Sequence, residues 1–488
     1  MLFNSSQFFI FFLIVTFLYF ALPQKFRWLL LLAASCVFYM ASSPIYILIP
    51  IYIIFVSYFA GIFIEKSKES KRKLSLVLSI VLICAVLFIF KYLNFFNTNL
   101  DYIARLFHWY YPIQHLSLIL PIGLSFYTFR SMGYVIEIYR GNQKSERNIG
   151  IYALYVMFYP ELLAGPIEKP QNLLHQFHED HYFDYRMVTD GLKLIAWGMF
   201  QKIVIADRLA MIVNPIYDNP TDYHSINLVI ATFFYAFQIF CDFSGYSDMA
   251  IGIGQVMGFR LMNNFNRPYF SKSVAEFWRR WHISLLTWFR DYIYISLGGN
   301  RVSVPRHYFN VLVVFLVSGL WHGANWTFII WGALHAFYMI FSLATRKQRE
   351  RIIEMIRLNK TPIILRTLRV FITFCLVCFT WIFFRANSVS DAIYIISNLF
   401  SGYRELLSFS ELAKVIASIG IPKQYFAISI FLIGVVVVIH LMQRHGSIRE
   451  MLAQKPAWVR WSIYYVGIMS IIFLGVLSSS QQFVYFQF

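Results

Sequence analysis

Long apolar segments recur along the whole chain and constrain its fold more than any other feature. Residues 45–64, 74–90, 370–384 and 431–441 are almost uniformly apolar, and most of these runs approach the ~20 residues that one membrane crossing needs. Only 14% of the 488 residues are charged, against roughly 25% in an ordinary soluble domain. The sequence therefore predicts an all-α polytopic membrane protein and excludes a water-soluble fold.

The basic residues lie in short segments between the apolar runs, and they predict the topology. The net charge is +18, but short basic loops next to apolar spans are typical of the cytoplasmic face and its anionic lipids, so we do not expect nucleic-acid binding. Placing residues 25–27, 66–73, 346–360 and 444–460 in the cytoplasm puts both termini and the turn at 322–325 outside. Residues 1–7 carry no Lys or Arg, which argues against a cleaved signal peptide. We expect a multi-pass protein of the inner membrane.

The middle of the chain contains apolar segments that proline and glycine interrupt. Residues 116–139, 151–166, 192–213 and 226–243 are broken by Pro121, Pro160, Pro166 and Pro215 and by the glycines from Gly245 to Gly258. Broken helices at membrane depth persist where protein or a water-filled cavity satisfies the freed backbone groups. We predict re-entrant segments that line a pocket, about 11 to 14 spans or half-spans in total, and one domain over residues 1–488.

Residues 276–292 place aromatic side chains at helical spacing. Trp278, Trp281, Leu285, Trp288 and Tyr292 follow one another at steps of three and four, which predicts one aromatic face on a continuous helix. Basic residues occupy the other faces, so an amphipathic helix at the cytoplasmic interface is one interpretation, and a catalytic role is the other.

Residues 317–326 place His322 between two apolar spans, beside the small residues Gly323 and Ala324. Ionisable groups at membrane depth are costly and usually mark a site, although a hydrogen-bonded structural histidine remains an alternative. The five cysteines lie in apolar stretches, and no His, Cys and carboxylate set has ligand spacing, so no metal site is expected.

Several ordered motifs resemble the membrane-bound O-acyltransferase (MBOAT) family, in its bacterial branch of alginate and peptidoglycan O-acetyltransferases and of the teichoic acid D-alanyl transfer protein. They are FWRRWH at 277–282, LWHG at 320–323, YPELLAGPI at 159–167, DFSGYSDMA at 242–250 and NFNRPY at 264–269. The resemblance covers residues from about Pro121 to Arg385 and beyond. It implies a ring of tilted helices around a thin centre, with a cytoplasmic funnel for the acyl donor and an outer funnel for the acceptor.

The resemblance also implies that His322 is the catalytic residue and that His282 is its upstream partner. Acyl transfer to an alcohol needs a base that removes the hydroxyl proton, and an imidazole with a pKa near ~6.5 suits that step. Asn325, Arg279 or a backbone amide near Gly323 are candidate oxyanion donors. No Gly-x-Ser-x-Gly elbow surrounds a candidate serine nucleophile.

The chain ends in the aromatic segment QFVYFQF at 482–488. One interpretation is a membrane-interface anchor, as aromatic belts predict. Family members that serve surface polysaccharides resemble one another in such a tail, which implies that Tyr485 carries the acyl group as a covalent intermediate. The charge-based topology places this tail on the same side as His322.

The leading hypothesis is an enzyme that takes an acetyl group from a cytoplasmic thioester donor, most simply acetyl-CoA, without a bound cofactor. A periplasmic SGNH-type acetyltransferase would receive the group and modify a cell-surface polysaccharide of the alginate or peptidoglycan type. Two alternatives stay open: D-alanyl transfer to teichoic acid, and a transporter or flippase, which would also have many spans and intramembrane polar groups.

Overall fold

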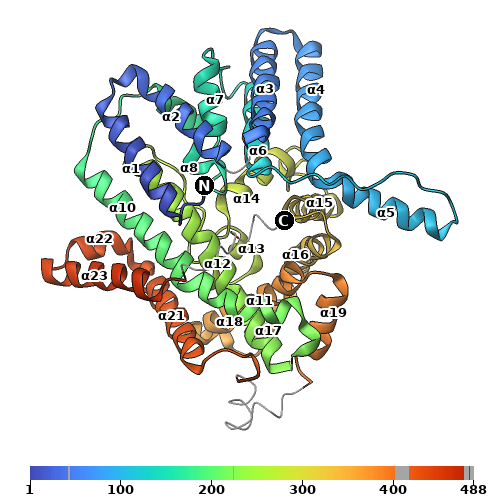
Figure 1. The fold of residues 1–488 in the computed structure, drawn as a ribbon. Helices are drawn as coiled ribbons and strands as arrows, with labels where there is room; N and C mark the ends of the chain where they lie inside the picture. Colours follow the sequence, from blue (N-terminus) through green and yellow to red (C-terminus); the bar gives the residue numbers. More distant parts are fainter. Residues whose placement is uncertain (42–43, 224, 402–416, 477–482, 484–488) are drawn as a thin grey trace. The chain divides into compact units, whose positions relative to one another are not determined.

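The computed structural model describes residues 1–41, 44–223, 225–401, 417–476 and 483. These residues form helices, turns and loops and contain no β-strand, which confirms the all-α prediction (Figure 1). Within the described residues, eight helical segments are long and apolar enough to cross a membrane. They are Pro44–Lys66, Glu69–Leu106, Ser225–Val256, Val304–His322, Trp326–Ala344, Pro362–Arg385, Lys423–His445 and Ala457–Leu474. The predicted ring of 11 to 14 spans stays a prediction, as does the single domain.

The described chain divides into two compact units, of which unit 1 contains residues 1–195 and 247–263. Its helices are α1 (Ser6–Ala21), α2 (Gln24–Met40), α3 (Leu48–Lys66), α4 (Glu69–Leu87), α5 (Leu93–Leu106), α6 (Leu124–Tyr139), α7 (Ile149–Met157), α8 (Tyr159–Leu162), α9 (Pro170–Leu173), most of α10 (Tyr185–Met199) and the last part of α12 (Ser225–Val256), with the short turns η1 (Pro44–Ile47), η2 (Phe88–Tyr92) and η3 (Leu174–His178).

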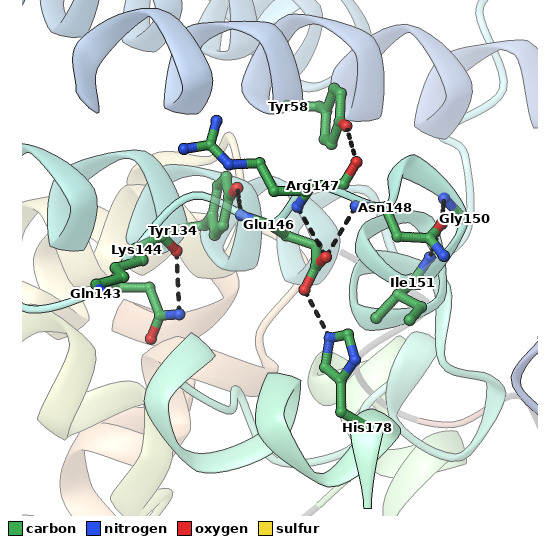
Figure 2. Close-up of polar contacts among 10 residues, drawn as sticks. All are labelled: Tyr58, Tyr134, Gln143, Lys144, Glu146, Arg147, Asn148, Gly150, Ile151 and His178. Atoms are coloured by element: carbon green, nitrogen blue, oxygen red, sulfur yellow. Dashed lines mark hydrogen bonds and ion pairs between the residues drawn. The ribbon is translucent and has the colours of Figure 1, made fainter. Parts of the chain in front are cut away.

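A polar network organises the loop between α6 and α7 in unit 1 (Figure 2). The Glu146 carboxylate accepts hydrogen bonds from the backbone N–H groups of Arg147 and Asn148, both at 2.8 Å, and its other oxygen lies 2.8 Å from His178 Nε2. The Tyr134 hydroxyl accepts from the Glu146 N–H at 2.9 Å. Asn148 then caps α7 by accepting from Gly150 N at 2.9 Å, so one loop is fixed between two helices.

Unit 2 contains residues 196–246 and 264–488. Its elements are η4 (Phe200–Ala206), α11 (Asp207–Asp218), η5 (Pro220–Asp222), the first part of α12, η6 (Pro268–Phe270), α13 (Val274–Trp278), α14 (Ile283–Phe289), η7 (Arg290–Tyr294), α15 (Val304–His322), α16 (Trp326–Ala344), α17 (Arg346–Met355), η8 (Leu358–Lys360), α18 (Pro362–Arg385), α19 (Val389–Asn398), α21 (Lys423–Met442), η10 (Gln443–His445), α22 (Ile448–Ala453) and α23 (Ala457–Leu474).

A buried ion cluster lies at η4, a π-helical turn. Lys202 Nζ contacts Asp207 Oδ1 at 2.8 Å and Asp242 Oδ1 at 2.5 Å, and all three side chains are buried. A buried ammonium needs such partners, because an unpaired buried charge costs several kcal/mol. The cluster therefore ties η4 and α11 to α12.

The predicted break of the glycine-containing segment after residue 243 is wrong. Helix α12 runs without interruption from Ser225 to Val256 through Gly245, Gly252 and Gly254. These glycines serve packing: a Cβ at Gly245 would lie 2.6 Å from the carbonyl oxygen of Gly198. Close helix contact outweighs the roughly 1 kcal/mol propensity cost of a helical glycine. Pro215 also lies inside a helix, α11.

Candidate active site

His282 lies at a sharp break between two short helices. Helix α13 ends at Trp278, α14 begins at Ile283, and His282 has a left-handed backbone with φ 44°. The prediction of one continuous helix over 276–292 is therefore wrong, because a residue at positive φ cannot continue a right-handed helix. The aromatic residues are also buried within the protein, with Trp281 only 1% exposed. The interpretation as an interfacial anchor is thus replaced by a packed segment.

Local capping explains where α13 begins. The Ser273 side chain accepts a hydrogen bond from Glu276 N at 3.2 Å, and the Glu276 carboxylate accepts from Lys272 N at 2.8 Å. This reciprocal pattern is a form of capping box. It fixes the start of the segment that leads to His282.

Asn264 orients the His282 ring. Asn264 Oδ1 lies 3.4 Å from His282 Nδ1 and accepts from Ser284 Oγ at 2.6 Å. A backbone hydrogen bond also joins these two segments of the chain: Ile283 N donates to Asn264 O at 2.9 Å. An amide oxygen facing Nδ1 favours the tautomer with the proton on Nδ1, so Nε2 carries the lone pair. Burial lowers the pKa of His282 to about 3, which keeps the imidazole neutral at physiological pH.

His322 is the last residue of α15 and lies on a tight α15–α16 hairpin. A Cβ at Gly319 would lie 2.4 Å from Phe328 O, and one at Gly332 would lie 2.3 Å from Phe315 O. Only glycine permits this approach of the two helix backbones. Asn325 begins α16 as its N-cap, accepting from Thr327 N at 3.0 Å. The close hairpin fixes the position of the imidazole.

Aromatic rings surround His322, whose side chain is buried. Its ring centroid lies 4.9 Å from Trp321, 5.0 Å from Trp331 and 5.2 Å from Phe384. Trp321 also contacts His282, at 6.0 Å between centroids. The structure thus brings both predicted histidines to one tryptophan ring.

The candidate oxyanion donors occupy different positions. The Gly323 N–H donates to Gly319 O at 3.3 Å and completes the end of α15. Asn325 caps α16, and its amide nitrogen donates to Asn387 O at 3.4 Å. Arg279 is exposed. Two of the three groups therefore take part in local structure, and an oxyanion role for any of them stays a prediction.

Sequence reasoning missed Asn264 as a positioning residue and His335 as part of the same aromatic cluster. His335 is fully buried on α16, where Nδ1 accepts from Trp278 Nε1 at 3.2 Å and Nε2 lies 3.0 Å from Thr380 Oγ1. Both ring nitrogens are engaged, so His335 links α13, α16 and α18. Asn264 lies in the NFNRPY motif, but the motif does not show that Asn264 contacts His282. That contact depends on how the chain reverses direction between the two residues.

The C-terminal tail is held in unit 2 at two described points. Val476 N donates to Ile203 O at 3.0 Å, next to the buried ion cluster. Phe483 is 1% exposed, and its ring lies 4.8 Å from Tyr246 and 5.7 Å from Phe243. Phe243 in turn contacts the His282 ring at 4.6 Å. Tyr485 lies outside the described residues.

The fold and the site define a helical, multi-span membrane protein with two histidines buried beside one tryptophan ring. Residues 148–385 match the family model described as MBOAT, membrane-bound O-acyltransferase family. The chain is 40% identical, over 82% of its length and 75% of the relative, to a probable alginate O-acetylase AlgI of Pseudomonas aeruginosa. It is 35% identical, over 82% of its length and 80% of the relative, to a peptidoglycan O-acetyltransferase of Helicobacter pylori.

A third relative is more distant: a teichoic acid D-alanyltransferase of Streptococcus thermophilus is 30% identical over 48% of this chain and 60% of the relative. The chain belongs to the MBOAT family and is an O-acyltransferase.

Proposed function

We propose that the protein transfers an acetyl group from a cytoplasmic thioester, acetyl-CoA, across the inner membrane for O-acetylation of a cell-surface polysaccharide. The observation that carries this proposal is His322, a buried histidine that shares the Trp321 ring with His282 in a chain whose relatives are named O-acetyltransferases. An imidazole removed from bulk water is suited to general-base catalysis of acyl transfer.

In the proposed reaction, a His322 nitrogen takes the proton of the Tyr485 hydroxyl while the phenol oxygen attacks the acetyl carbonyl carbon. A C–O bond forms, the C–S bond breaks, and the leaving thiolate takes the proton from the imidazolium. The aryl ester on Tyr485 is then an activated donor. A hydroxyl of the acceptor attacks that ester, and the phenol is released in its starting form.

The Phe483 contacts support Tyr485 as the carrier. Phe483 packs on Tyr246 and Phe243, and Phe243 packs on His282. Phe483 precedes Tyr485 by two positions in the sequence. A membrane-interface anchor would not need a buried residue at 483.

The test of the relay compares His322→Ala and Tyr485→Phe with His445→Ala, a change at an exposed histidine. We expect both site variants to lose glycan acetylation at normal protein levels, while His445→Ala retains it. Retained acetylation in Tyr485→Phe would remove the relay. Retained acetylation in His322→Ala would remove the catalytic base and favour a transporter or flippase.

Phe483→Ala tests the docking of the tail, with Phe473→Ala as its control because Phe473 is 77% exposed on α23. We expect Phe483→Ala to lower acetylation at least about tenfold, as loss of a positioned nucleophile does, and Phe473→Ala to leave it unchanged. Equal activity of the two variants would mean that Phe483 does not position the carrier.

The acceptor is proposed to be a polysaccharide of the alginate or peptidoglycan type, reached through a periplasmic SGNH-type acetyltransferase. The support is the names of the relatives that this chain matches over 82% of its length. Mass analysis of surface glycans from a deletion strain separates the alternatives. Loss of acetyl groups is expected, whereas loss of D-alanyl esters would assign the protein to teichoic acid modification.

A further inference from the structure

A short segment of unit 2, η6, is enclosed by two of the long helices. The Tyr269 ring lies 5.3 Å from Phe374 of α18, and the Phe270 ring lies 6.2 Å from His440 of α21. Arg267 directly precedes η6 and has a left-handed backbone with φ 48°. Such a conformation is uncommon for a long side chain and persists only where the surrounding structure imposes it. The Arg267 backbone is therefore fixed where α18 and α21 approach η6.

Four arginines belong to this segment and to the elements that pack near it: Arg267 before η6, Arg280 after α13, Arg366 on α18 and Arg444 on η10, which follows α21. Arg280 Nη1 donates to the Arg267 carbonyl oxygen at 3.5 Å. Partial burial and the positive charges of Arg280, Arg366 and Arg444 together lower the pKa of Arg267. We call these four residues the arginine cluster.

The arginine cluster carries more positive charge than the protein itself neutralises. Within the described part of the chain, the carboxylate that forms an ion pair with it is Glu276, at 2.6 Å from Arg280 Nη2. Four like charges and one opposite charge leave a net positive field, which is unfavourable in the absence of an anion. Guanidinium groups bind phosphate with paired N–H donors, and several together suit a ligand with more than one phosphate.

We propose that the arginine cluster binds the phosphate groups of the coenzyme A part of the thioester donor. This inference rests on the proposed function. The pattern of basic loops predicts that η10 and the start of α18 face the cytoplasm, where such a donor would be found. Phosphate headgroups of anionic lipids share the same chemistry, so the test must separate the two sources.

The spacing along α18 fits a donor whose thioester reaches His322. Tyr269 contacts Phe374, and His322 contacts Phe384 at 5.2 Å between ring centroids. Ten helical residues separate these two levels, which is about 15 Å at 1.5 Å per residue. The flexible pantetheine arm of coenzyme A has a comparable extended length. Phosphates held beside η6, where Arg267 lies, therefore leave the acyl end at the level of His322, whereas Arg366 lies eight residues before Phe374, about 12 Å further along α18.

The experiment measures binding of coenzyme A, dephospho-coenzyme A and pantetheine to the purified full chain in phosphatidylcholine nanodiscs. Arg366→Gln/Arg444→Gln is the test variant, because both side chains are exposed and the substitutions should not disturb folding. Arg351→Gln, an exposed arginine on α17 outside the cluster, is the matched control. The unmodified protein should bind coenzyme A most tightly, dephospho-coenzyme A less tightly and pantetheine most weakly.

We expect the double variant to bind coenzyme A about a hundredfold more weakly, roughly tenfold for each lost charge-assisted contact, and Arg351→Gln to bind it normally. Equal affinity of the double variant and the unmodified protein would overturn the inference. So would equal binding of all three ligands. In nanodiscs that also contain phosphatidylglycerol, loss of bound anionic lipid from the variant with unchanged coenzyme A affinity would assign the cluster to lipid instead.

Binding is measured without turnover, so failure here is distinct from failure of the proposed function. His322→Ala should still bind coenzyme A while losing acetylation. If His322→Ala retained acetylation, the proposed chemistry would fail, whereas unchanged coenzyme A binding by the double variant would remove only the role of the arginine cluster.

Discussion

At the scale of single residues, the two site histidines are fixed in different ways. His322 is the last residue of α15, and the close α15–α16 hairpin fixes its position. His282 is placed by a helix break and by the side chain of Asn264. Because Asn264 acts on His282 and not on the substrate, it is a positioning residue whose effect should appear in turnover.

Asn264→Ala should lower the acetylation rate by about ten- to a hundredfold, because loss of the group that orients a site residue typically costs that much. Asn263→Ala, at the exposed neighbouring position, is the control. The measurement is kcat and KM for acetyl transfer by purified protein. A change confined to KM would contradict the positioning role, since Asn264 would then act on substrate binding.

Acid should destabilise the protein in part through His282. Its pKa is about 3 in the folded protein because of burial, against about 6.5 in an unfolded chain. The unfolded state therefore binds an extra proton between these values, so this contribution to stability is complete above pH 6.5 and is lost as the pH falls toward 3. Thermal unfolding in detergent across this range should show a shallower acid-side fall for His282→Asn than for the unmodified protein. Parallel curves would contradict the assignment.

The residues that sequence analysis identified are those with a strong local signal. His322 and His282 lie in compact motifs whose resemblance to the family named them. Asn264 lies in the NFNRPY motif and His335 lies in none of the quoted motifs, but the sequence indicated neither role, because these roles depend on hydrogen bonds to residues 18 and 57 positions away in sequence. Periodicity reports one helix face at a time and cannot report contacts of that kind.

At the scale of helices, the long apolar segments were predicted and the short ones were not. Residues 45–64 fall within the helical segment Pro44–Lys66, formed by η1 and α3, and residues 370–384 fall within α18, as expected from length and hydropathy. Residues 276–292 kept helical spacing in sequence, but His282 interrupts the helix and the π-turn η7 follows it. Tertiary packing of the tryptophans outweighed local propensity, which spacing alone could not reveal.

The α15–α16 hairpin gives a direct test at this scale. Gly319→Ala or Gly332→Ala would place a methyl group within 2.4 Å of a backbone carbonyl oxygen, and backbone cannot move aside as a flexible side chain can. We expect about 1–3 kcal/mol of destabilisation and loss of activity, because the helix carrying His322 must shift.

Gly434→Ala in α21 is the matched control, because a Cβ there meets nothing within 4 Å. An exposed helical glycine replaced by alanine should gain about 0.5–1 kcal/mol. Thermal unfolding of the three variants in the same detergent checks both signs. Similar melting temperatures for Gly319→Ala and Gly434→Ala would contradict the close hairpin.

At the scale of the whole molecule, the composition predicted a membrane-embedded helical fold, and the basic loops predicted which segments face the cytoplasm. The proposed function depends on that orientation. The proposed reaction needs a donor side and an acceptor side, with His322 and the C-terminal tail accessible from the latter. Helix α18 connects the two levels within unit 2, from the arginine cluster near its start to Phe384 beside His322. Hydropathy predicts that α18 crosses the membrane, but it does not indicate which end of α18 would bind the donor and which end would lie beside His322. Those roles are inferred from the contacts that η6 and α15 make with α18.

Cysteine labelling tests this sidedness. The background is a variant in which the five native cysteines, free of disulfides in the structure, are replaced by alanine. Single cysteines are then introduced for Glu354 on α17 and for Asn387 after α18, both exposed positions. Because the basic segment 346–360 is predicted to face the cytoplasm, a membrane-impermeant maleimide should label Asn387→Cys in intact cells and Glu354→Cys only after permeabilisation. The reverse pattern would place His322 at the cytoplasmic end of α15, and an ester formed on Tyr485 beside His322 could not reach an acceptor outside the membrane.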